Sequence, residues 1–124
     1  MAYTGRFLDF VVEAVEHWFD EFFGLDWYDL NENMGFGTPF RHVELEFQDK
    51  LTPRDIVETE LRISKVTRTT ISFEILSYGN SKALGRRLCF TGKCTIVFVK
   101  FDTEKSAAIP DEFREKLEAA GFTD

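Results

Sequence analysis

The chain has 124 residues, of which 44% are apolar and 15% aromatic, with 14 phenylalanines and a net charge of −7. We expect a single domain over residues 1–124, because this length suits one domain and the apolar fraction suffices for a packed core. The acidic balance argues against nucleic-acid binding, no apolar run is long enough to cross a bilayer, and the N-terminus lacks the pattern of a signal peptide. We therefore expect a cytoplasmic protein with neither a nucleic-acid nor a membrane partner.

The first predicted element is a helix over residues 7–23 that ends at Gly24. Acidic residues recur in it at spacings of three and four, so they form one stripe that faces solvent or a partner subunit. Nearly all its other positions are apolar, and such a helix must be covered by other elements. The stripe consists of Asp9, Glu13, Glu16 and Asp20. The residues expected to pack against a sheet are Val11, Val15, Trp18 and Phe22.

Four strands and a short helix are predicted after a turn-rich segment. Apolar and polar residues alternate in each strand, which is typical of half-buried antiparallel strands. The expected strands cover residues 41–48, 57–64, 71–75 and 84–101, and the terminal helix covers residues 110–121. One apolar helix followed by long antiparallel strands predicts an α+β fold in which the sheet wraps around the helix.

The cysteines and histidines carry no sign of a disulfide or a metal site. Cys89 and Cys94 lie in the same predicted strand, about 16 Å apart, which is too far for a disulfide. His17 and His42 have no cysteine or carboxylate at metal-ligand spacing. A glycine-rich phosphate loop and a Gly-x-Ser-x-Gly elbow are also missing from the sequence. We therefore expect two free thiols, no metal and no cofactor.

A more specific signal lies in the order and spacing of several short segments. They are residues 2–10, 37–39, 43–47, 51–55, 69–74, 92–99 and 109–113. Together, over nearly the whole chain, they resemble the hot-dog fold acyl-CoA thioesterases, in particular the 4-hydroxybenzoyl-CoA thioesterase-like group. The resemblance implies a hot-dog fold, an acyl-CoA substrate bound between protomers, and a homodimer or homotetramer.

The same resemblance implies which groups act on the thioester. Hydrolysis needs an oxygen nucleophile, donors for the oxyanion and a site for the CoA tail. The backbone N–H of Thr4 matches the family's oxyanion donor, although an ordinary helix start explains this position equally well. The family's catalytic Asp would lie just upstream of Met1, so we expect this chain to be N-terminally short and to lack that Asp and the first strand. A sheet without that strand has an unpaired edge, which favours association with another chain.

Basic residues near strand ends are the candidates for binding CoA. Arg68 matches the position of a cation for the CoA phosphates in the family, Thr70 matches a neighbouring hydroxyl, and Lys65 flanks the same connection. Each charge is also explained as solvated surface, but a cluster of cations on an acidic protein suggests an anionic ligand. Further candidates without positional support are Arg86, Arg87 and Lys93.

Two functions follow from these observations. An acyl-CoA thioesterase would hydrolyse a CoA thioester to the free acid and CoA. A non-catalytic acyl-CoA-binding hot-dog protein would keep the fold and pocket without the catalytic carboxylate, and the absent Asp supports this alternative. A hot-dog dehydratase has less support, because no His–Asp pair lies at the helix entrance. If the chain is active as it stands, Asp9 or Glu13 is the first candidate for the carboxylate.

Overall fold

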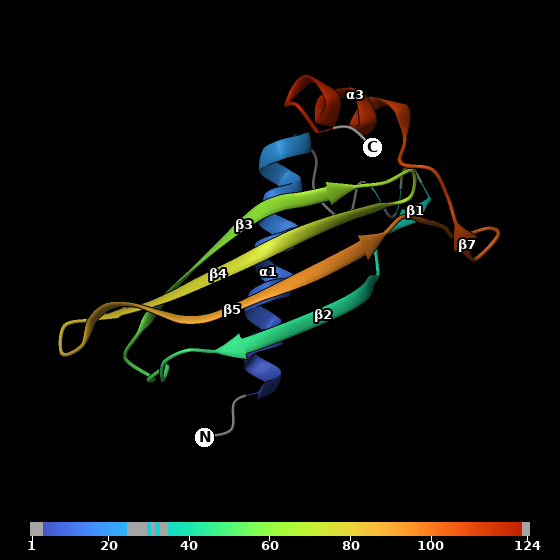
Figure 1. Cartoon of the computed structure of the whole chain (residues 1–124). Coiled ribbons are helices and arrows are strands. Elements are labelled where there is room, and N and C mark those ends of the chain that lie inside the picture. Colours follow the sequence, from blue (N-terminus) through green and yellow to red (C-terminus); the bar gives the residue numbers. More distant parts are fainter. Residues whose placement is uncertain (1–3, 25–29, 31, 33–34, 123–124) are drawn as a thin grey trace.

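A computed structural model of the chain describes residues 4–24, 30, 32 and 35–122 (Figure 1). The helices are α1 (Thr4–Phe23) and α3 (Asp111–Ala119). The strands are β1 (Phe36–Gly37), β2 (Phe40–Phe47), β3 (Ile56–Val66), β4 (Thr70–Ser81), β5 (Gly85–Val97), β6 (Val99–Lys100) and β7 (Lys105–Ser106). The predicted long helix, the four main strands and the terminal helix are thus all present.

The four long strands form one antiparallel sheet in the order β2-β5-β4-β3 that lies across α1 (Figure 1). The predicted last strand, residues 84–101, is divided, because the chain leaves this sheet after Val97. Val99 pairs with Gly37 instead, which makes β6 part of a small second sheet of order β1-β6-β7. Among the described residues, no strand lies beside the outer edges of β2 and β3.

One face of α1 is buried against the sheet. Val11, Val15, Phe19 and Phe23 are at most 2% exposed, and their spacing of four residues places them on one face of the helix. The expectation for Val11 and Val15 is therefore confirmed. Trp18 also meets the sheet as expected, with its ring centroid 4.9 Å from that of Phe73 in β4. Trp18 and Phe22 are nevertheless only half-buried and stack on each other with ring centroids 4.9 Å apart. Leu8 is 44% exposed, so the sheet covers the helix from one side and does not enclose it.

The C-terminal end of α1 is held by α3. Gly24 has φ +73°, the left-handed conformation expected of a glycine that ends a helix. Phe113 of α3 stacks on Phe23 with ring centroids 4.3 Å apart. Lys116 Nζ donates a hydrogen bond of 2.7 Å to the carbonyl oxygen of Phe23. The positive charge of Lys116 is also stabilised there by the negative end of the helix dipole.

Both cysteines are free and buried, as predicted. Burial raises the pKa of the Cys94 thiol to about 12, so this thiol is protonated and unreactive at neutral pH. Of the helices that the structure describes, none combines the length and the apolar character needed to cross a membrane. The described residues also contain no group of three or more side chains suited to holding a metal ion.

Candidate functional site

A cavity of about 330 Å³ lies beside the N-terminal half of α1. Its wall on the helix side is formed by Phe7 and Phe10, and the ring of Phe7 also packs against Phe47 and Phe90 of the sheet. The remaining lining comes from the start of β3 and from the loop between β2 and β3, residues 48–55, and consists of Leu51, Thr52, Pro53, Asp55 and Val57.

The start of α1 adjoins this cavity. Thr4 is the first residue of the helix, and Phe7, one turn later, lines the cavity. The first backbone N–H groups of a helix have no acceptor within the helix and carry the positive end of its dipole. Donors of this kind can stabilise a developing oxyanion. The predicted donor Thr4 thus lies one helical turn before Phe7 in the cavity wall.

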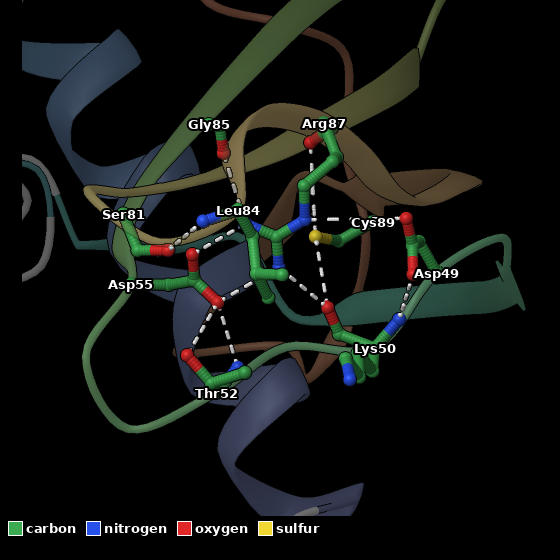
Figure 2. Close-up of polar contacts among 9 residues, drawn as sticks. All are labelled: Asp49, Lys50, Thr52, Asp55, Ser81, Leu84, Gly85, Arg87 and Cys89. Atoms are coloured by element: carbon green, nitrogen blue, oxygen red, sulfur yellow. Dashed lines mark hydrogen bonds and ion pairs between the residues drawn. The ribbon is translucent and has the colours of Figure 1, made fainter.

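Both carboxylate oxygens of Asp55, which lines the cavity, accept hydrogen bonds from other groups of the protein (Figure 2). The guanidinium of Arg87 donates to Oδ1 at 2.7 Å and to Oδ2 at 2.9 Å. The backbone N–H and the hydroxyl of Thr52 donate to Oδ2 at 2.7 and 2.9 Å. The Asp55 side chain has no exposed surface, and that of Arg87 is 14% exposed.

These bonds decide what Asp55 can do chemically. The hydrogen bonds from Arg87, followed by those from Thr52, hold the pKa of the Asp55 carboxyl well below its usual range. A carboxylate that weakly basic is a poor general base, and its burial keeps it from acting as a nucleophile. Asp55 is therefore a structural carboxylate at the wall of the cavity.

We expect acid to destabilise the protein through Asp55. Because its folded-state pKa lies below the ordinary value of 3.8, its stabilising effect is fully present above that value and is lost as the pH falls through the folded-state pKa. The melting temperature of the wild type should therefore fall more steeply below about pH 4 than that of Asp55→Asn, which lacks the titrating group. Parallel curves for the two proteins would contradict this role.

Arg68 lies at the other end of the sheet. It is an exposed residue in the turn between β3 and β4, and no ion pair involves its side chain within the described part of the chain. Its carbonyl oxygen accepts hydrogen bonds from the N–H of Ile109 at 2.9 Å and from the guanidinium of Arg114 in α3 at 3.2 Å. The turn is thus fixed by its backbone, while the Arg68 guanidinium stays available for an anion.

The two other predicted CoA-binding residues differ in accessibility. Lys65, near the end of β3, is exposed. Thr70 is 6% exposed, and its hydroxyl lies 2.6 Å from the hydroxyl of Thr67. The backbone N–H of Thr70 also donates to the Thr67 hydroxyl, at 3.0 Å. In this structure Thr70 therefore shapes the turn that carries Arg68.

The three additional cations lie apart from the Arg68 turn. The Cζ atom of Arg86 lies 3.8 Å from the centroid of the Tyr78 ring, and Arg87 forms an ion pair with Asp55. Lys93 is exposed in β5, where its register partners are Glu44 and Glu74. The members of the acidic stripe on α1 are all exposed, as predicted: Asp9, Glu13, Glu16 and Asp20.

The ion pair that stabilises the loop between β2 and β3 was not predicted from the sequence, in which Arg87 was only a candidate for binding CoA. The spacing of Thr52 and Asp55 is a local signal for a hydroxyl-to-carboxylate bond, comparable to that of a capping box. Arg87 follows Asp55 by 32 residues, and the pairing of β4 with both β3 and β5 brings the two together. No local pattern contains that contact.

Comparison with known proteins identifies the family. A model of the thioesterase-like superfamily matches residues 1–117, whereas no curated protein matches the chain. A solved thioesterase-superfamily structure from Jannaschia sp. CCS1 is 32% identical, with a TM-score of 0.79 over 96% of this chain and 80% of that one.

More distant solved structures share the fold. The 4-hydroxybenzoyl-CoA thioesterase of Pseudomonas sp. strain CBS-3 has a TM-score of 0.82 at 18% identity, over 94% of this chain and 85% of that one. A hypothetical protein from Staphylococcus aureus in complex with CoA has a TM-score of 0.80 at 15% identity, over 100% of this chain and 75% of that one. These similarities confirm the predicted hot-dog fold, and with the family match they show that the chain belongs to the thioesterase-like superfamily.

Proposed function

We propose that this protein binds an acyl-CoA thioester and hydrolyses it to the free acid and CoA. The observation that carries the proposal is the apolar cavity beside the start of α1. An acyl group in the cavity would place the thioester carbonyl near the first backbone N–H groups of the helix, with Thr4 as the donor to the oxyanion. Membership of the thioesterase-like superfamily supports this chemistry, and the neighbour solved with CoA supports the ligand class.

The CoA tail would be bound by a second copy of the chain. The 20 residues of α1 span about 30 Å from Thr4. The Arg68 turn contacts α3, which packs on the far end of that helix, so one protomer does not bring Thr4 and Arg68 together. Antiparallel pairing of two β2 edges about a twofold axis would turn one protomer end to end. Arg68 and Lys65 of the partner subunit would then lie at the end of the sheet where Thr4 begins the helix. This proposal therefore includes a homodimer with the substrate bound across its interface.

One observation favours the alternative, an acyl-CoA-binding protein without hydrolytic activity. Asp55 is the only carboxylate among the described residues that line the cavity, and it is buried and bonded to Arg87. Asp9 is exposed and lies about 100° or more around the helix from both Phe7 and Phe10. The described lining thus contains no free nucleophile.

Two measurements distinguish these functions. We expect release of CoA from a series of acyl-CoA thioesters to be saturable if the protein is a thioesterase. We expect calorimetry to detect binding of non-hydrolysable acyl-CoA thioethers whether the protein is a thioesterase or only binds acyl-CoA. Binding without turnover would identify the alternative, and the absence of both would refute the proposal.

If turnover is found, the source of the carboxylate can be tested within the acidic stripe. Asp9→Asn and Glu13→Gln are the informative variants, and Glu16→Gln, one turn further from the helix start, is the matched control. A selective loss of kcat in Asp9→Asn or Glu13→Gln would place the catalytic carboxylate on α1. Unchanged kcat in all three variants would exclude the stripe.

A further inference from the structure

We propose that Asp55 and Arg87 are positioning residues that set the depth of the cavity and, through it, the longest acyl group that the protein accepts. The inference rests on the proposed function, because it assigns the cavity to the acyl group. Neither residue needs to touch the ligand. The Asp55 side chain is fully buried and that of Arg87 is 14% exposed, so both act through the loop of residues 48–55.

Residues 51–53 of this loop line the cavity and lie between two points that Arg87 holds, Lys50 and Asp55 (Figure 2). On one side, Nη2 of Arg87 donates to the carbonyl oxygen of Lys50 at 2.8 Å. On the other side, the guanidinium binds both carboxylate oxygens of Asp55. Thr52, between these points, donates its N–H and its hydroxyl to the same carboxylate. One arginine therefore fixes both ends of the cavity wall.

The space behind the wall is closed by β4. A Cβ atom added at Gly79 would lie 2.9 Å from Cδ1 of Leu51, 2.9 Å from Sγ of Cys89 and 3.2 Å from Cγ of Asp55. Leu51 thus packs directly against the backbone of Gly79, which limits its movement away from the cavity on this side. The glycine allows the deepest position of Leu51, and Arg87 keeps the loop in that position.

The experiment measures the affinity of alkyl-CoA thioethers of increasing chain length by calorimetry. In the wild type, each methylene that enters the cavity should strengthen binding about fourfold, until a cutoff length at which the cavity is full. Arg87→Lys keeps the charge but cannot form the paired bonds, so the wall should loosen and the cutoff should move to longer chains. Gly79→Ala should push Leu51 into the cavity and move the cutoff to shorter chains.

The control is Arg86→Lys, because Arg86 is the adjacent residue on β5 but stacks on Tyr78 outside the loop. It should keep the wild-type cutoff, and free CoA should bind all variants with wild-type affinity. A loss of folded protein lowers the binding of every ligand by the same factor, so a purely structural role cannot move the cutoff. If Arg87→Lys does not fold, Thr52→Val, which removes only the 2.9 Å hydroxyl bond to Asp55, takes its place.

The outcomes separate this inference from the proposed function. Opposite shifts of the cutoff in Arg87→Lys and Gly79→Ala would support the positioning role. An unchanged cutoff in both variants, with normal binding of CoA thioethers, would overturn the positioning role alone. A wild-type protein that binds neither CoA nor its thioethers would refute the proposed function itself.

Discussion

Replacement of Val15 with Asp should lower the free energy of unfolding by more than about 3 kcal/mol. Val15 is 0% exposed in the middle of α1, where a carboxylate would be removed from water without a partner. Urea denaturation of the wild type and the variant measures the difference. Leu8→Asp is the matched control, because Leu8 lies on the same helix and is 44% exposed.

The two substitutions introduce the same charge into the same helix, at a buried and at an exposed position. Leu8→Asp should change the free energy of unfolding by less than about 1 kcal/mol. Equal stability of Val15→Asp and the wild type would show that the sheet does not cover this face of the helix, contrary to the fold described above.

Arg68→Ala should weaken the binding of CoA about 10-fold to 150-fold, because a charge-assisted bond to a phosphate contributes about 1.5–3 kcal/mol. The melting temperature should hardly change, since the Arg68 side chain is exposed and its turn is held by the backbone carbonyl, which alanine keeps. Calorimetry with free CoA measures the affinity, and the loss should shrink as the salt concentration rises.

Arg62→Ala provides the control for Arg68→Ala. Arg62 is an exposed arginine of β3 that lies 3.8 Å from Glu60, away from the turn. It should retain wild-type affinity for CoA. Equal affinity of Arg68→Ala and the wild type would place the phosphate-binding cations elsewhere on the protein.

The periodic elements of the fold could be predicted from the sequence because they are encoded by nearby residues. The helical spacing of Val11 and Val15 identified the buried face of α1, and Gly24 marked its end. The alternation of Val43 and Leu45 with charged neighbours identified β2. Each of these signals depends on backbone periodicity, which a short stretch of chain contains in full.

Other features depend on contacts between distant segments. The predicted last strand ends early because Val99 pairs with Gly37, and Trp18 remains half-buried because the sheet covers only one face of α1. Thr70 could be matched to a family position, but only its contact with Thr67 shows that its hydroxyl is already bonded. These contacts cannot be predicted from a local sequence pattern, because they form only when separate segments of the chain pack together.

The sequence by itself determined the fold class, the long helix with its buried and acidic faces, and the family, because these depend on spacing along the chain. Only the tertiary structure decided that Arg87 is bound to Asp55 instead of being free for CoA. It also decided that the start of α1 and the turn between β3 and β4, which carries Arg68, lie far apart in one protomer (Figure 1). The physical reason is that a cavity and an ion pair exist only once strands and loops far apart in sequence are packed together.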